Sequence, residues 1–147
     1  MSQVILEGFD DLQKAFQSIS EIPDGVLKNA VNAMGEVACR YVRREGEAMG
    51  VKDPENSEHI LDSIAFSKPK KGRDGNMKGF VTFTGARIRG NTRTWNAAIA
   101  YVNEYGAPRR GIAARPFIST GMARGEKDIT KPAEEIIGDW IEKTYLT

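Results

Sequence analysis

The chain has 147 residues, of which 40% are hydrophobic and 28% charged, and its formal net charge is +1. A chain of this length buries roughly 70% of the surface that its unfolded form exposes, so we expect one domain over residues 1–147. It has no apolar run near the ~20 residues of a membrane-spanning helix and no basic region of a secretory signal, which predicts a soluble protein, without membrane contact, that acts or is assembled inside a cell.

The N-terminal part, residues 4–49, is predicted to contain a short strand and two helices. The strand is expected at residues 4–8, and apolar side chains at spacings of three and four predict a helix over residues 9–19. Pro23 and Gly25 break this pattern. A longer helical period then runs to about Met49, so we expect a helix about 35 Å long that forms the spine of the domain.

The central part, residues 60–106, is predicted to be a small antiparallel sheet with basic loops. We expect an extended end in "ILDSIAFSKP", a turn at "KKGRDGN" and a strand at "GFVTFTG", which alternates with Val81 and Phe83 on one side. A second basic loop is expected at "GARIRGNTRTWN". The next strand is expected at "AAIAYVNEYG", and it ends at Gly106.

The C-terminal part, residues 116–145, is predicted to be helical. Pro116 suits the first turn of a helix, and "PAEEIIGDWIEKTYL" carries an apolar stripe that begins at Pro132. The order of the elements predicts the α+β class: N-terminal helices, one of them long, packed on a small antiparallel β-sheet and followed by a C-terminal helix.

Charge is distributed unevenly along the chain. The segment from Lys68 to Arg115 contains eleven Lys or Arg and two acids, a net charge of +9, so the remainder carries −8. In one interpretation the two parts neutralise each other within the fold or point into water. In the other, basic and acidic surfaces meet between copies of the protein.

The residue patterns of enzymes are incomplete in this chain. "GARIRGNT" has the glycine spacing of a phosphate loop, but Asn91 stands where the phosphate-binding lysine is required. Cys39, the only cysteine, excludes an internal disulfide and lies in the predicted long helix, where an inert packed thiol is the usual case. The single histidine, His59, is expected at the surface. The sequence therefore predicts no catalytic site, no cofactor and no metal site.

The stretch "YVNEYGAPRRGIAARPFIST" is predicted to present a contact surface. Gly106 permits a turn and Pro116 holds Arg115 extended, so we expect an ordered basic loop between a strand and a helix. The alternative is that Glu104 pairs with Arg115 and closes the loop internally. Together with the preceding basic segment, the candidate partner or subunit interface consists of Arg87, Arg89, Arg93, Trp95, Glu104, Tyr105, Gly106, Arg109, Arg110, Arg115 and Phe117.

Sequence-independent DNA binding through residues 68–95 is the alternative function. Lys70, Lys71 and Arg73 are the candidate DNA-facing residues, and Trp95 follows the second basic loop. A basic groove with a stacking aromatic side chain is how such proteins hold a nucleic-acid backbone. Against this, the pI is only about 7.8, the aromatic residues are not interleaved with the basic ones, and no recognised binding motif is present.

The order of an acid-Tyr-Gly triplet, a short basic loop, Ala-Arg-Pro-Phe and a terminal helix resembles the minor tail component family of long-tailed bacteriophages and prophages. Its members are variously called tail completion, neck or head-tail joining proteins. "LEGFDDLQKAF" resembles the opening of that family, and "ILDSIAF" resembles its Leu-x-x-Ser-Ile strand. The chain departs from the family pattern in its strongly basic "KKGRDGN" and "GARIRGNTRT" and in "STGMARGEKDITKPAEE", which interrupts or lengthens the final helical region.

The resemblance implies a non-enzymatic virion assembly protein that joins a finished tail to the DNA-filled head as one subunit of a ring. Its implied partners are other tail and neck proteins: tail terminator, head-closure or connector proteins. Its implied locations are the virion neck and, during assembly, the host cytoplasm. We expect residues 68–78 and 85–95 to lie at a subunit or partner interface, or to line the channel through which DNA passes.

Overall fold

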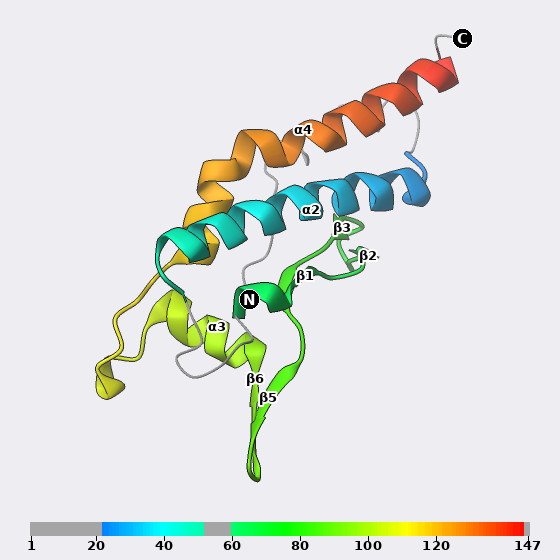
Figure 1. Cartoon of the computed structure of the whole chain (residues 1–147). Helices are drawn as coiled ribbons and strands as arrows, with labels where there is room; N and C mark the ends of the chain where they lie inside the picture. Colours follow the sequence, from blue (N-terminus) through cyan, green and yellow to red (C-terminus); the bar gives the residue numbers. More distant parts are fainter. Residues whose placement is uncertain (1–21, 52–59, 146–147) are drawn as a thin grey trace.

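The computed structural model describes residues 22–51 and 60–145, and it has the predicted α+β class (Figure 1). The helices are α2 (Asp24–Ala48), α3 (Asn96–Tyr105) and α4 (Phe117–Tyr145), with the short 3-10 helices η1 (Ile60–Ser63) and η2 (Pro108–Arg110). The strands are β1 (Ile64–Phe66), β2 (Lys70–Lys71), β3 (Met77–Lys78), β4 (Val81–Phe83), β5 (Ala86–Arg89) and β6 (Thr92–Trp95). The expected strand at residues 4–8, the helix at residues 9–19 and His59 lie outside the described residues. No helix in the described ranges is long and apolar enough to cross a membrane.

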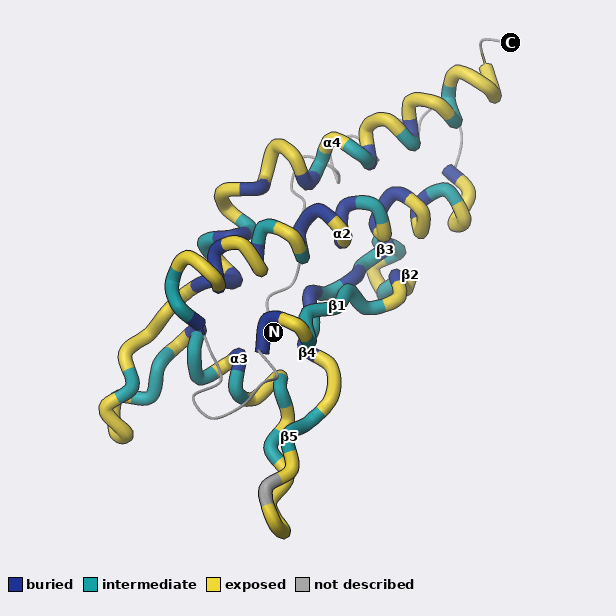
Figure 2. Tube along the Cα trace, in the orientation of Figure 1, coloured by how far each residue is buried: buried dark blue, intermediate teal, exposed yellow. Residues whose placement is uncertain are grey.

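The core is built around α2, which lies between α4 on one side and the short strands on the other (Figure 1). Helix α2 begins after Pro23 and is capped by Met49, as predicted. Its buried apolar residues recur at helical spacing, which is why it can pack on both layers. They are Leu27, Ala30, Val31, Met34, Val37, Ala38 and Val42. Figure 2 shows these buried positions along α2, and further buried positions at intervals along α4.

Helix α4 is one continuous helix of 29 residues, so the C-terminal part is helical as predicted, and the stretch "STGMARGEKDITKPAEE" lengthens this helix and does not interrupt it. Pro132 lies inside the helix, where it removes one backbone hydrogen bond. The buried positions of α4 nevertheless keep spacings of three or four on both sides of it, so packing against α2 maintains the helix. Those positions are Phe117, Ile118, Gly121, Gly125, Ile129, Ala133 and Ile137. Arg124 adds an ion pair at 2.7 Å to the buried Glu45 of α2.

The three sheets of the described region are two-stranded and antiparallel. Strand β1 pairs with β4, in which Val81 and Phe83 are buried on either side of a half-buried Thr82, as the alternation predicted. Strands β2 and β3 pair across a turn at residues 72–76, inside the predicted turn "KKGRDGN", whose first two residues form β2. Both predictions hold because a turn with glycine and an alternating strand are set by near neighbours in sequence.

Two predictions between Gly85 and Gly106 are wrong. The expected basic loop is the β5–β6 hairpin, which closes at Gly90 and Asn91 with Gly90 at φ 54°, a conformation that glycine adopts without strain. The expected strand is helix α3. A short apolar run does not by itself separate strand from helix, and the alanines of this run favour the helix. Its two buried residues, Ala100 and Glu104, lie four positions apart on one face.

Candidate interaction surface

The β5–β6 hairpin projects from the body and has two chemically different faces (Figure 1). Ile88 lies opposite Arg93 and therefore shares a face with it, whereas Arg87 and Thr94 lie opposite each other on the other face. Ile88 is 64% exposed and Trp95 is 57% exposed. The Arg93 guanidinium lies 5.5 Å from the centroid of the Trp95 ring, a cation-π distance. One face therefore combines apolar side chains with a stacked arginine.

The other face of the hairpin lines a basic cleft that it forms with α3 and the loop after α3. Three of the predicted interface residues, Arg87, Arg110 and Arg115, meet at this cleft although they come from separate segments. Its apolar lining comes from Ile99 and Val102 of α3 and from the loop. Among the residues that the structure describes, the lining consists of Arg87, Thr94, Ala98, Ile99, Val102, Asn103, Arg110, Gly111, Ile112, Ala113 and Arg115. We call this set the basic cleft.

The loop that carries Arg110 is ordered, as predicted. Gly106 has φ 74°, and an added Cβ there would lie 2.8 Å from the Ala114 nitrogen, so no larger residue fits this turn. Ala107 and Ile112 form an isolated antiparallel bridge. The Arg115 backbone N–H donates to the Asn103 carbonyl at 2.6 Å, and its guanidinium donates to the Gly50 carbonyl at 3.0 Å. The loop is therefore held at both ends.

Glu104 ties α3 to the beginning of α4, and the predicted alternative of a Glu104–Arg115 pair is wrong. Its carboxylate accepts hydrogen bonds from the backbone N–H groups of Ile118 at 2.8 Å and Ser119 at 3.1 Å. The first N–H groups of a helix have no partner within the helix and favour a negative charge. Glu104 is only 5% exposed and Phe117 is fully buried, so both support the elements of the interaction surface from the interior of the domain.

Loss of the Glu104 carboxylate is expected to destabilise the chain. Glu104→Ala should lower the free energy of unfolding by about 2–3 kcal/mol, because the buried N–H group of Ile118 and the partly buried N–H group of Ser119 lose a charged acceptor. Glu104→Gln should cost less, since its amide oxygen still accepts. Urea unfolding measures both, with Glu135→Ala on the exposed side of α4 as the control. Equal stability of Glu104→Ala and this control would contradict the capping role.

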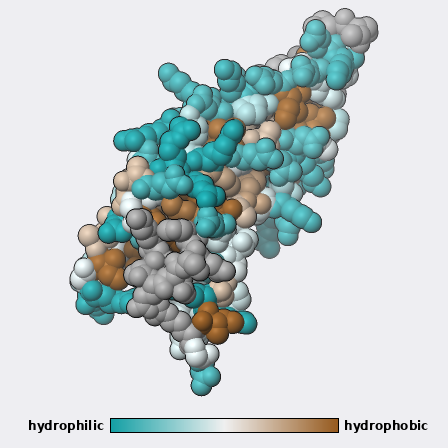
Figure 3. Space-filling view, in the orientation of Figure 1, coloured by the Kyte–Doolittle hydropathy of each residue, from teal (hydrophilic) through white to brown (hydrophobic). Residues whose placement is uncertain are grey.

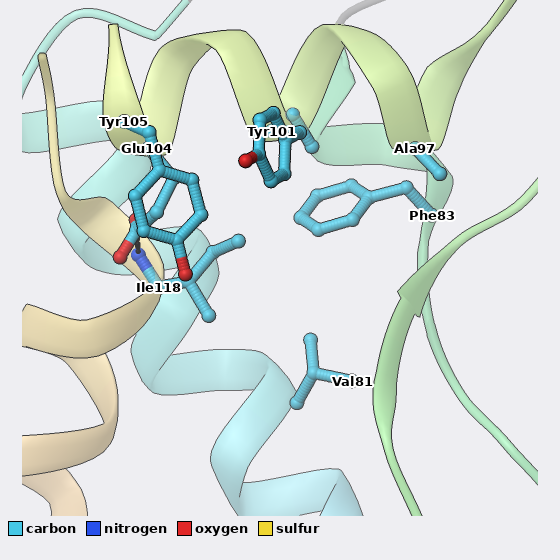
Figure 4. Close-up of a pocket in the computed structure, with 8 residues that line it drawn as sticks. Val81, Phe83, Ala97, Tyr101, Glu104, Tyr105 and Ile118 are labelled. Carbon is cyan, nitrogen blue, oxygen red and sulfur yellow. Dashed lines mark hydrogen bonds between the residues drawn. The ribbon is translucent and has the colours of Figure 1, made fainter. Parts of the chain in front are cut away.

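An apolar pocket lies on the opposite side of α3 from the basic cleft. Figure 4 shows Tyr101 and Tyr105 extending from α3 over this pocket, with Phe83 and Ile118 also lining it. The two tyrosines are 58% and 59% exposed, and their ring centroids are 4.7 Å apart. Sequence reasoning named Tyr105 but missed Tyr101. The two tyrosines are four residues apart in the sequence, and this spacing places both rings on one face when the segment is a helix.

The remaining predicted residues lie on separate surfaces. The exposed Lys70, Lys71 and Arg73 belong to the β2–β3 hairpin beside α2, and the Lys71 ammonium is 3.4 Å from the Asp24 carboxylate. Residue Arg89 ends β5 opposite Thr92. Arg109 is exposed in η2. The two basic segments predicted as loops are therefore two different hairpins (Figure 1).

Two further candidates for chemistry are the stretch "GARIRGNT" and Cys39. "GARIRGNT" forms the β5–β6 hairpin and lacks the strand-loop-helix geometry of a phosphate loop. Burial, with a smaller contribution from the Glu36 charge, raises the pKa of the Cys39 thiol to about 11. This thiol is therefore protonated at neutral pH and is a poor nucleophile.

Comparisons of the chain with family models, with curated proteins and with solved structures found no match. The fold and surface thus define an α+β domain that presents a projecting hairpin and a basic cleft.

Proposed function

We propose that the chain is a non-enzymatic structural protein of a phage or prophage that acts in tail completion or head-tail joining, as one subunit of an oligomeric ring. The proposal starts from the motif resemblance. It is supported by the position of the Ala-Arg-Pro-Phe motif, which ends an anchored basic loop beside the projecting hairpin. Its partners are neighbouring tail and neck proteins, and its location is the virion neck after assembly in the host cytoplasm.

The observation that carries the proposal is the exposure of large apolar side chains on a basic hairpin. Ile88 and Trp95 are each more than half exposed, next to Arg93. Aromatic and arginine side chains are enriched at protein interfaces, and a projecting hairpin gains stability when a partner covers its apolar face. A ring or neck neighbour provides that cover.

Sequence-independent DNA binding is the second candidate, and the stacked Arg93–Trp95 pair favours it. Stacking aromatics beside positive charge bind single strands, and positive charge alone binds duplex backbones. The discriminating measurement is the slope of the logarithm of DNA affinity against the logarithm of salt concentration. A steep negative slope together with tight binding at physiological salt supports DNA binding. Absence of binding there supports a protein partner.

Deletion of the gene tests the joining function directly. We expect electron microscopy of an induced lysate to show filled heads beside separate tails.

A variant that combines Arg87→Glu, Arg89→Glu and Arg93→Glu should give the same result. The thermal unfolding of the purified variant should stay within a few degrees of the wild type, because these positions lie on the hairpin outside the core. Lys127→Glu, at an exposed position of α4, is the control and should leave virions intact. Intact virions from the deletion strain would overturn the proposal.

A further inference from the structure

Large apolar side chains that face water are concentrated on the β5–β6 hairpin and on α3. In the described part of the chain five such side chains are exposed, and four of them belong to these two elements. They are Ile88, Trp95, Tyr101 and Tyr105, each more than half exposed. Single exposed apolar residues are ordinary, but a concentration of them marks an interaction site. The hairpin and α3 therefore carry surface that a partner would cover.

The pocket beside Tyr101 and Tyr105 has the size of one aliphatic side chain. We call it the tyrosine pocket, and its described lining consists of Val81, Phe83, Ala97, Ala100, Tyr101, Glu104, Tyr105 and Ile118 (Figure 4). Its volume is about 60 Å³, which is room for about four water-sized groups, the size of an isoleucine or leucine side chain. The carboxylate of Glu104 already accepts two hydrogen bonds from the start of α4. The pocket therefore suits an apolar side chain and not a charged ligand.

Ile88 has this size and lies on the projecting part of the molecule. It is the next-to-last residue of β5, and the hairpin extends away from the helices (Figure 1). Figure 3 shows hydrophobic surface at this end of the molecule, beside hydrophilic residues. A two-stranded hairpin has no second layer against which to bury its faces, and it is marginally stable by itself. Burial of Ile88 in a partner would therefore stabilise the hairpin as well as the contact.

Ile88 does not fill the tyrosine pocket of its own chain, because its side chain is mostly exposed. It pairs with Arg93, about 10 Å along β6 before α3 begins at Asn96. The base of the hairpin is fixed at this point. The Asn96 backbone N–H donates to the Gly85 carbonyl at 3.0 Å, and its side-chain amide donates to the Thr84 carbonyl at 2.7 Å. An isoleucine that enters the pocket therefore comes from another molecule.

The neighbour of Ile88 on the hairpin also matches the rim of the pocket. Arg93 shares a face with Ile88, and the rim carries the rings of Tyr101 and Tyr105. A guanidinium against a tyrosine ring makes a favourable cation-π contact. A symmetric contact between two hairpin faces would instead bring Arg93 of each copy together, and like charges repel. A hairpin that docks on the tyrosine pocket of a second copy therefore fits better than two hairpins face to face.

We propose that Ile88 of one copy inserts into the tyrosine pocket of a second copy, with Arg93 against the tyrosine rings. The contact is head-to-tail, because it joins two different surfaces of the same chain. Such contacts close into rings when the rotation between subunits permits it. The inference deepens the proposed function and rests on it for its biological setting, because it names the two surfaces that join neighbouring ring subunits.

One substitution on each surface tests this contact. Ile88→Glu removes the inserted side chain, and Ala97→Phe fills the pocket from an exposed position of α3. Sedimentation equilibrium of the purified full-length wild type should show self-association, and each variant alone should weaken it about tenfold or more. The matched controls are Thr92→Glu, exposed on the other face of the hairpin, and Ala98→Phe, exposed on the side of α3 toward the basic cleft. Both should associate like the wild type, and circular dichroism should show that all four variants are folded.

A mixture of the two variants tests the head-to-tail arrangement. Ile88→Glu keeps an intact pocket, and Ala97→Phe keeps an intact Ile88. An equimolar mixture should therefore form one-to-one heterodimers that grow no further, because each chain retains one working surface. A chain that carries both substitutions should stay monomeric, alone and with either single variant. If Ala97→Phe does not fold, Ala97→Leu fills the pocket with a smaller side chain and gives the same comparison.

Three outcomes would overturn the inference: a wild-type chain that stays monomeric up to about 1 mM, unchanged self-association in Ile88→Glu, or a mixture without heterodimers. A monomeric wild type whose binding to DNA or to another tail protein is lost in Ile88→Glu assigns the hairpin to that occupant and rejects the self-contact.

The joining assay separates this contact from the proposed function. Loss of joining in Ile88→Glu with unchanged self-association leaves the function standing and rejects the contact. Heterodimers in the mixture, for a chain whose gene deletion gives intact virions, confirm the contact and reject the function.

Discussion

Phe117→Ala is expected to lower the free energy of unfolding by about 3–5 kcal/mol, the largest effect of any single substitution considered. The ring is completely buried at the first residue of α4. It contacts the Phe83 ring of β4 edge-on, with centroids 5.8 Å apart, and it lies close to Gly46 of α2. Truncation to alanine therefore leaves a cavity where α2, β4 and α4 meet, and close-packed surroundings relax only partly into it.

Urea or guanidinium unfolding followed by circular dichroism measures this loss. Phe117→Leu keeps most of the volume and should cost less than about 1.5 kcal/mol. Tyr101→Ala removes an aromatic ring that is 58% exposed and should change stability by less than about 1 kcal/mol. If Phe117→Ala and Tyr101→Ala unfold at the same denaturant concentration, the core assigned to Phe117 is incorrect.

Gly121→Ala is expected to destabilise the chain by about 2–4 kcal/mol, although alanine is normally the better helix former. An added Cβ would lie 2.8 Å from both the Tyr41 carbonyl oxygen and the Val42 Cα of α2. These are backbone atoms, which cannot rotate away as a side chain can. The two helices would have to move apart, and the contacts on both sides of the crossing would loosen.

Gly138→Ala on the same helix is the matched control. Nothing lies within 4 Å of a Cβ added there, so the substitution should stabilise the chain by about 0.5–1 kcal/mol through the helix propensity of alanine. Thermal unfolding of the two variants should therefore shift in opposite directions. A higher unfolding temperature in both variants would show that α2 and α4 do not approach each other closely at Gly121.

These stability variants also bear on the proposed surface. The basic cleft is lined by the hairpin, by α3 and by the loop before α4, and the buried Phe117 and Glu104 hold these elements in place. Substitutions at Phe117 should weaken joining through stability. Substitution of the exposed Arg110, which lines the cleft, should weaken it at unchanged stability. This difference separates loss of the surface from loss of the fold.

Much of the fold could be predicted from the sequence because neighbouring residues decide it. The apolar period after Pro23 predicted α2, and the alternation around Val81 and Phe83 predicted β4. The sequence also indicated the ordered basic loop, because Gly106 and Pro116 restrict the backbone at its two ends. In each case the physical cause lies within a few residues along the chain.

Only the tertiary structure decided the features that depend on distant partners. Residues 96–105 form a helix because Ala100 and Glu104 pack on one face, and a short apolar run does not specify which period it will adopt. Packing on α2 keeps α4 helical across Pro132. The carboxylate of Glu104 was expected to face either a partner or Arg115. It instead accepts hydrogen bonds from backbone N–H groups of α4. These N–H groups lack a partner within the helix, and they lie beside Glu104 only when α4 begins there. The sequence by itself thus determined the composition, the uneven distribution of charge and the local elements. The folded chain was needed to bring Arg87, Arg110 and Arg115 together at one cleft, because a local sequence pattern does not specify which distant segments will be neighbours.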